Sequence, residues 1–358
     1  MREYFLDRDF FETKNEFLFC VIGNIHPPDR VISYLKYAPS SGRKRTKWRK
    51  KDTFFDRILP FYSAVGVSLT RDIIERYYPD YIVWDDVLGI EMIEVPMEDI
   101  RKHFLPERRV EEILEDPSDK LEKETAELIR VLSDESDVPS SSFGVTGSIL
   151  LKIHDVVYSD IDLIVYGKEN AFAVREAVKR LINDNTSFYR PSGRILEEWA
   201  RELIRVHPLS LKEAMLLRGK DKWDRLFFNK RQFSLHPVLR KDEMPEKYGD
   251  RIYRGEGLAE IRARVKNSEY SLFMPAIYEV EDVQIMKGPA VNDLREVASF
   301  ESIYTDIATE GEWIRVFGML ERVFDRRSGE EYHRIVVGTF DAGGRDYIKP
   351  ERWFSLTD

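Results

Sequence analysis

Two aspartates at the start of one apolar strand constrain this chain more than any other feature. The segment from Asp160 to Tyr166 alternates between polar and apolar residues and then becomes wholly apolar. Residues two apart on a strand point to the same face, so Asp160 and Asp162 are predicted to project side by side, with Ile161 facing a core. Adjacent carboxylates repel each other, and this face is therefore expected either to be solvated or to bind a divalent cation.

A short turn upstream of the aspartates supplies a second half to this pattern. Phe143-Gly144-Val145 has the character of a short strand, and Thr146-Gly147-Ser148 is typical of a tight turn that opens a helix. Glycine lets the backbone approach a ligand closely, and N–H groups and a hydroxyl at a helix start favour anions. Gly147 and Ser148 are thus candidates for phosphate binding, although serine is also an ordinary N-cap residue. Lys152, one turn later, is a further candidate.

Together these segments resemble the signature of the DNA polymerase beta-type nucleotidyltransferase superfamily. That signature is an apolar residue, Gly and Ser, a spacer of about nine to thirteen residues, and Asp-apolar-Asp on a strand. Here the spacer runs from Ile149 to Ser159, and the resemblance covers about residues 143–185. More loosely, the whole chain is similar to uncharacterised predicted nucleotidyltransferases of archaeal genomes, which carry a similar pair of motifs and an early His-Pro-Pro-Asp-Arg-Val segment.

The resemblance implies a role for each residue of the motif. Asp160 and Asp162 would be the catalytic residues and the ligands of Mg²⁺ or Mn²⁺, and Gly147, Ser148 and Lys152 would bind the nucleotide. Two such ions about 4 Å apart can clamp an in-line phosphoryl displacement. The resemblance implies transfer from a nucleoside triphosphate and leaves the acceptor open.

The superfamily pattern also has a third acid on a later strand, and this sequence departs from it. The strand expected at Gln232–Pro237 offers Ser234 and His236 in place of Asp or Glu. His236 is a candidate third ligand or base because a free imidazole titrates near neutral pH. Glu260, on a second strand, is the other candidate, and the sequence does not choose between them.

Composition narrows the class of protein. With 42% hydrophobic residues the chain can bury real cores, and with Cys20 as its single cysteine it cannot form an intrachain disulfide or a cysteine-based metal site. No stretch approaches the roughly 18 apolar residues of a membrane span. We therefore expect a cytoplasmic protein without a membrane partner.

Charge is distributed unevenly along the chain. The net charge of -9 argues against a general nucleic-acid coat protein. However, seven of the nine residues from Arg43 to Lys51 are basic, and Trp48 lies among them. This run is expected to be an exposed loop, and it keeps RNA or DNA open as a partner. Residues 107–137 carry twelve acids against five bases and are expected to form an amphipathic helix with a charged outer face.

The order of expected elements predicts an α+β protein. We expect a central mixed sheet with helices that bears the motif, an N-terminal α/β region and a C-terminal β-rich domain that forms a barrel or sandwich. The expected boundaries are 1–138, 139–254 and 255–358. Helices are predicted at Phe54–Tyr62 and Thr70–Tyr77, and the later strands include Gly257–Val265, whose alternation places Ala259, Ile261 and Ala263 on one face.

These observations lead to one main expectation and two alternatives. The main expectation is a metal-dependent nucleotidyltransferase that moves a nucleoside monophosphate to an unknown hydroxyl acceptor. The first alternative is a catalytically decayed module of this fold that binds nucleotide or nucleic acid, which the missing third acid would suit. The second is an assembly partner that docks another subunit through its acidic helix.

Overall fold

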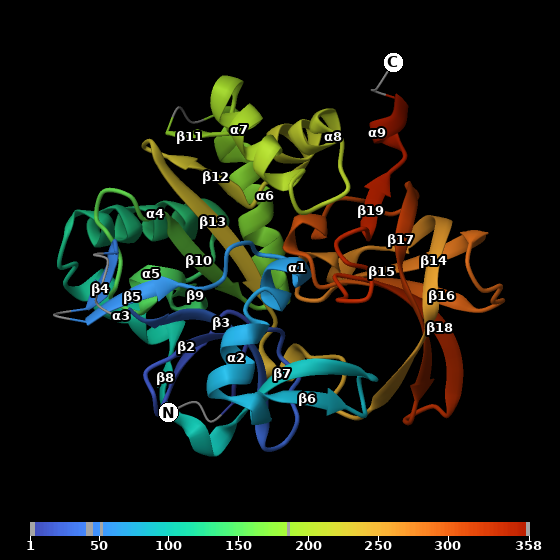
Figure 1. Cartoon of the computed structure of the whole chain (residues 1–358). Coiled ribbons are helices and arrows are strands. Elements are labelled where there is room, and N and C mark those ends of the chain that lie inside the picture. The colour runs from blue at the N-terminus through green and yellow to red at the C-terminus, as the bar shows by residue number, and fades with distance from the viewer. Residues whose placement is uncertain (1–3, 41–45, 51–52, 185–186, 356–358) are drawn as a thin grey trace. The chain divides into compact units, whose positions relative to one another are not determined.

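The α+β class predicted from the sequence is confirmed by a computed structural model (Figure 1), which describes residues 4–40, 46–50, 53–184 and 187–355. The chain divides into two compact units, each built from three separate segments. The first unit contains residues 1–59, 95–191 and 223–245, and the second contains 60–94, 192–222 and 246–358. The segment 139–254 that carries the motif contributes to both units.

The first unit contains two sheets. In one, the strands follow the order β4-β5-β3-β2-β1-β8, and in the other the order is β11-β12-β13-β10-β9. The strands of the first sheet are β1 (Phe10–Thr13), β2 (Leu18–Val21), β3 (Arg30–Pro39), β4 (Trp48–Lys50), β5 (Thr53–Arg57) and β8 (Ile100–Phe104). Those of the second are β9 (Phe143–Val145), β10 (Ile161–Tyr166), β11 (Phe188–Tyr189), β12 (Arg225–Phe228) and β13 (Arg231–Val238).

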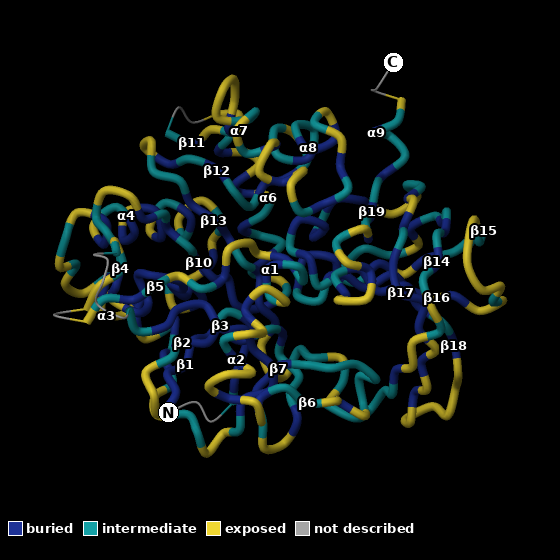
Figure 2. The backbone as a smooth tube through the Cα atoms, in the orientation of Figure 1, coloured by how far each residue is buried: buried dark blue, intermediate teal, exposed yellow. Residues whose placement is uncertain are grey.

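Helices cover the second sheet and fix its central strands. These helices are α3 (Pro106–Glu115), α4 (Lys120–Ser136), α5 (Gly147–Leu150) and α6 (Lys168–Asp184). Strands β10 and β13 are parallel neighbours, and α6 packs against both of them and against α4. Most residues of β9, β10 and β13 are buried, and Figure 2 colours the chain by this burial. The residues of β10 that carry the candidate site are thus anchored by a fully packed strand.

The face of β10 that bears the aspartates turns apolar within one residue pair. Ile164 and Tyr166 lie on the same face as Asp162, and they are buried in a cluster with Leu6 and Val238. The N-terminal segment therefore covers this face beyond the aspartates. This agrees with the predicted alternation, in which only the start of the face is polar.

One local prediction in the first unit is wrong. Residues Phe54–Tyr62 were predicted as a helix, but Thr53–Arg57 forms strand β5, paired antiparallel with both β3 and β4. The apolar spacing in this short segment fits either element, and pairing with two neighbouring strands decides it. The basic run was predicted as a loop. Its residues 48–50 form β4, and 43–45 and 51 lie outside the described residues.

The acidic segment folds as two helices, α3 and α4, in place of one. Buried positions alternate with charged ones along both, as predicted for an amphipathic helix. Arg109 on α3 is an exception, because its guanidinium is buried, pairs with the buried Glu122 and donates to the backbone oxygen of Ile149 at 3.1 Å. The ion pair joins α3 to α4, and breaking it would cost about 3–5 kcal/mol because a buried charge would be left unpaired. The hydrogen bond to Ile149 joins the same arginine to helix α5 of the motif.

The second unit is dominated by a barrel, which agrees with the predicted β-rich C-terminal region. Strands β14, β15, β16, β18 and β17 form a closed ring, because β14 pairs with both β15 and β17, and β19 adds to β17. The strands are β14 (Arg251–Asn267), β15 (Ala276–Lys287), β16 (Leu294–Ser299), β17 (Trp313–Asp325), β18 (Glu330–Val337) and β19 (Tyr347–Pro350). The unit also contains α1 (Ala64–Ser68), α2 (Arg71–Tyr77), β6 (Ile82–Asp85), most of β7 (Ile90–Pro96), α7 (Gly193–Leu203), α8 (Leu211–Leu216) and α9 (Arg352–Ser355).

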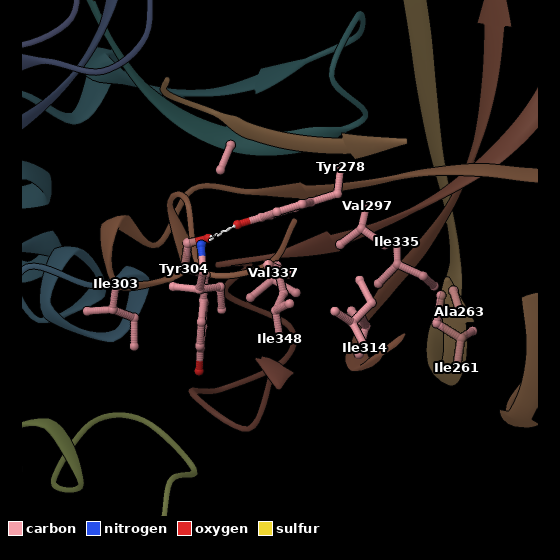
Figure 3. Close-up of a cluster of buried hydrophobic side chains, with 14 of the residues drawn as sticks. Ile261, Ala263, Tyr278, Val297, Ile303, Tyr304, Ile314, Ile335, Val337 and Ile348 are labelled. Atoms are coloured by element: carbon pink, nitrogen blue, oxygen red, sulfur yellow. Dashed lines mark hydrogen bonds between the residues drawn. The ribbon is translucent and has the colours of Figure 1, made fainter. Parts of the chain in front are cut away.

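The core of this unit lies inside the barrel. Figure 3 shows Ile261 and Ala263 of β14, which were predicted to share one face of that strand, pointing toward Ile314 and Ile335. The hydroxyl of Tyr278 donates to the backbone oxygen of Tyr304 at 2.6 Å, so even the polar tip of this buried ring has a partner.

A buried glutamate in this unit predicts an unusual dependence of stability on pH. Glu301 accepts a hydrogen bond from the N–H of Ala64 at 2.8 Å, and its other oxygen is buried without a partner among the described residues. Burial, with a smaller contribution from the charge of Asp346, raises the pKa of Glu301 to about 8 from a usual value of 4.5. The folded state therefore binds a proton that the unfolded state releases between these pH values.

We expect the free energy of unfolding to fall as the pH rises through this window, because stability decreases with pH wherever the folded state binds more protons. Between pH 6 and pH 8 the loss should be about 2–3 kcal/mol. Urea unfolding at both pH values measures it. The Glu301→Gln variant, which cannot ionise, should lack this fall, and an unchanged pH dependence in that variant would contradict the assignment.

Candidate active site

The turn before helix α5 is shaped by its contact with the second aspartate. Gly147 has a φ of +66°, and a Cβ atom placed on it would lie 2.6 Å from Oδ2 of Asp162. The N–H of Thr146 donates to the backbone oxygen of Asp162 at 2.9 Å, which joins the turn to β10. Glycine is thus required here both for the left-handed backbone and for the close approach.

Ser148 lies in the same turn and is tied to the chain that leads into the aspartates. Its Oγ is 3.4 Å from Oγ of Ser159, which accepts a hydrogen bond from the N–H of Asp155. Ser148 is buried. Lys152 takes a different direction, because its Nζ pairs with Glu112 on α3 at 2.8 Å.

Asp160 and Asp162 lie on one face of the chain at the start of β10, and β13 supplies their neighbours. In the parallel register, Asp162 is opposite Ser234 and Ile164 is opposite His236. The hydroxyl of Ser234 donates to Oδ1 of Asp162, and Nε2 of His236 lies 3.0 Å from that hydroxyl and 3.9 Å from the same carboxylate. Since the serine proton is used on Asp162, His236 must donate to Ser234, which makes one directed chain of hydrogen bonds.

The two carboxylates differ in their tendency to ionise. Burial, together with the negative charge of Asp162, raises the pKa of Asp160. Burial also acts to raise the pKa of Asp162, but His236, the charge of Lys36 and the Ser234 hydrogen bond outweigh it and hold that pKa below its usual range. Burial and the charge of Arg8 lower the pKa of His236, so its imidazole is neutral at pH 7.

Two cationic residues near the aspartates were missed in the sequence. Lys36 on β3 is buried and lowers the pKa of both carboxylates. Arg225 on β12 lies opposite Ser234, and its charge lowers the pKa of Asp160. The sequence did contain a clue to Lys36, because it lies within an apolar strand segment. A lysine there is rarely buried unless it has a charged partner, which predicts an acid nearby.

The two candidates for a third ligand or base fall in different units. His236 lies beside Asp162 in the first unit, as described above. Glu260 belongs to β14 in the second unit, where it pairs with Nζ of Lys287 at 2.9 Å and accepts from the hydroxyl of Tyr347 at 3.0 Å. Of the two, His236 is the residue that the first unit brings to the aspartates.

Comparison with known proteins identifies the family. The chain is 31% identical over 350 residues to an uncharacterized protein, MJ1086, of Methanocaldococcus jannaschii. The match covers 96% of this chain and 98% of that protein. The chain belongs to the family of this archaeal protein. No protein-family model and no solved structure matches it.

A second cluster of metal-ligating side chains lies elsewhere in the first unit. Ligand atoms of Asp119, Glu122 and His154 all lie within 4.8 Å of one another. Asp119 caps helix α4 and contacts His154 at 2.8 Å, and Glu122 is paired with Arg109 and accepts from Ser118. Because these carboxylates already have partners, the cluster is explained as a structural connection between α3, α4 and the loop after α5.

Among the described residues, each helix is too short or too polar to cross a membrane.

Proposed function

We propose that the protein is a divalent-metal-dependent nucleotidyltransferase. The observation that carries this proposal is the joint arrangement of Asp160, Asp162 and Gly147, in which a bare glycine backbone lies against one of two carboxylates on the same face. That arrangement fits the superfamily resemblance of the motif. The family relationship supports no particular activity, so the proposal rests on the site.

The donor set suits a hard divalent cation. Two half-buried carboxylates lie together, and the pKa of Asp160 is raised first by burial and then by the negative charge of Asp162. Mg²⁺ and Mn²⁺ prefer carboxylate oxygen, which both aspartates supply. When bound, such a cation would neutralise the carboxylates, polarise the phosphoryl group and stabilise the leaving pyrophosphate.

The protein's own residues would bind and orient. Ser234 and His236 hold Asp162 ionised and in one orientation, which is what a metal ligand requires. Because Gly147 has no Cβ, its backbone can lie against the carboxylate of Asp162, and Ser148 lies in the same turn, where the resemblance expects triphosphate. Lys152 is a weaker candidate for nucleotide binding, because Glu112 already pairs with it.

The proposed reaction joins two substrates. The acceptor hydroxyl oxygen forms a bond to the α-phosphorus of a nucleoside triphosphate, and the bond from that phosphorus to pyrophosphate breaks. The electron pair of the broken bond leaves with pyrophosphate, and the hydroxyl proton is released to water. The products are a nucleotidylated acceptor and pyrophosphate.

A second candidate function is a nucleotide-binding module without transferase activity. It is favoured by Ser234, which lies opposite Asp162 on the neighbouring strand, where the superfamily resemblance would expect a third acid. In this case the site would bind nucleotide and metal, and no product would form.

One experiment separates these functions. The full chain is incubated with each labelled nucleoside triphosphate, Mg²⁺ or Mn²⁺, and RNA, DNA or its own protein as acceptor, and nucleotide binding is measured in parallel. Labelled product supports the transferase, and nucleotide binding without product supports the module. Neither binding nor product with any nucleotide would contradict both.

A further inference from the structure

A group of cations on the first unit is not used by the proposed chemistry. We define the basic surface as Lys47, Arg49 and Lys50 of the β4 region with Arg101 and Lys102 of β8. All five are exposed. Strands β4 and β8 are at opposite ends of their sheet order, but Nζ of Lys50 and of Lys102 lie 5.7 and 4.5 Å from the centre of the same Phe104 ring. The sheet therefore curls until its two ends share one cationic surface.

The basic surface carries more positive charge than its own carboxylates balance. Glu12 is paired with Arg101 at 2.7 Å. Among the described residues, Lys47, Arg49, Lys50 and Lys102 have no ion pair with a carboxylate. Burial, followed by the charge of Lys102, lowers the pKa of Lys50, so these cations repel one another in the absence of an anion. The net charge of the chain is -9, so this cluster of positive charges is not needed for solubility.

Backbone hydrogen bonds connect the basic surface to the turn formed by Thr146, Gly147 and Ser148, which we call the nucleotide turn. The N–H of Arg49 donates to the backbone oxygen of Ile153 at 3.3 Å, and the N–H of Ile153 donates to the backbone oxygen of Ser148 at 3.0 Å. Two hydrogen bonds thus separate β4 from the residue expected to contact triphosphate. An anion on this surface would lie close to the reaction site.

An exposed aromatic side chain lies in the loop that leads from Ile153 to the aspartates, next to Ser159, whose Oγ is 3.4 Å from Oγ of Ser148. Tyr158 is 73% exposed and lies two residues before Asp160. Its loop is held by Arg231, which donates to the backbone oxygens of Val156, Val157 and Ser159 at 2.9–3.0 Å. A fixed loop that presents an aromatic ring to solvent is suited to stacking on a base.

We propose that the basic surface binds the phosphate backbone of a single-stranded polynucleotide and that Tyr158 stacks on one of its bases, so that the strand's terminal hydroxyl is the acceptor. Cations that have no carboxylate partner and an exposed ring are the two features by which proteins bind single strands without reading their sequence. This inference names the acceptor of the proposed transferase and so rests on that function. Its bond changes are those given above, with the terminal hydroxyl as the attacking group.

The test measures binding apart from catalysis. Fluorescence anisotropy of labelled 20-nucleotide RNA and DNA strands is recorded with the full chain, without nucleotide and with EDTA, over a series of salt concentrations. The variant Arg49→Gln, Lys50→Gln, Lys102→Gln should bind at least about 10-fold more weakly and show a shallower salt dependence, by about two in the slope for three lost phosphate contacts. Tyr158→Ala should weaken binding by about 10-fold, and Tyr158→Phe should restore it.

A matched control removes three exposed cations from the outer helices. The variant Lys123→Gln, Lys179→Gln, Arg180→Gln, with one change on α4 and two on α6, alters the net charge by the same amount as the first triple variant. It should keep the affinity of the unchanged protein. Equal losses in both triple variants would overturn the assignment to this surface. So would displacement of the strand by polyglutamate as readily as by unlabelled strand, which would indicate a general anion surface.

The outcomes for binding and for transfer remain distinct. Asp160→Asn, Asp162→Asn should bind the strand normally, because this inference places the strand on other residues. Strand binding by the basic surface without any transfer would support the strand site but contradict both the transferase and the assignment of the terminal hydroxyl as its acceptor. Transfer to a protein or small molecule, with no strand binding, would support the transferase and overturn the inference. The RNA and DNA arms identify which strand is bound.

Discussion

The double variant Asp160→Asn, Asp162→Asn is expected to fold normally and to lose nucleotidyl transfer by at least about 10³-fold, the loss that corresponds to about 4 kcal/mol of transition-state stabilisation. Asparagine keeps the size of each side chain but removes the charge that would hold a divalent cation. The measurement is the rate of labelled product formation at saturating Mg²⁺, with the thermal midpoint recorded in parallel.

Stability should distinguish this loss from unfolding. Burial and the charge of Asp162 raise the pKa of Asp160, so removing both charges also removes their mutual repulsion. The hydrogen bond from Ser234 can still be accepted by an asparagine oxygen. A matched control, Asp134→Asn with Glu135→Gln, removes two exposed acids from α4 and should keep full activity. Full transfer in the Asp160→Asn, Asp162→Asn variant would end the proposal that these carboxylates bind the catalytic metal.

The position of this pair could be predicted because strand alternation is a local property. The face that carries Asp160 and Asp162 needed only the period of two along one strand. The same reasoning placed Ala259, Ile261 and Ala263 on one face of their strand, and all three are fully buried. The alternation of polar and apolar residues is sufficient to predict which side chains share a face wherever one face of the strand is buried.

The partners of these aspartates depend on a register that local patterns do not contain. Ser234 and Asp162 are 72 residues apart, and they meet because β10 and β13 are parallel in one register out of several. The sequence proposed the strand and two of its polar residues, but it could not show that Ser234 would lie opposite Asp162. Arg225 was missed for the same reason, since strand β12 was not predicted.

The helix predicted at Phe54–Tyr62 failed for a related reason. A short apolar run has no period that separates helix from strand, and pairing with β3 and β4 decides between them. That pairing bears on the proposed strand binding, because β4 carries Arg49 and Lys50 of the basic surface. What appeared in the sequence to be a charged loop includes a strand that is hydrogen-bonded toward the nucleotide turn.

The second large effect is expected from one methyl group at Gly147. In Gly147→Ala the new Cβ would lie 2.6 Å from Oδ2 of Asp162, a separation that cannot be accommodated without moving the carboxylate or the turn. We expect transfer to fall by about 10²-fold or more, since a shift of about 1 Å at a reacting group has effects of this size. The measurement is the rate of product formation at several Mg²⁺ concentrations, because a displaced ligand should also raise the Mg²⁺ requirement.

The strain of a positive φ must be separated from the contact with Asp162. Gly343 has a φ of +59°, close to the +66° of Gly147, and a Cβ there would meet nothing within 4 Å. Gly343→Ala should therefore lose a similar amount of stability, about 1 kcal/mol, and keep its activity. If both variants lost activity equally, the effect would come from general destabilisation. If Gly147→Ala kept full activity and an unchanged Mg²⁺ requirement, the close contact between Gly147 and Asp162 would have no role in the reaction.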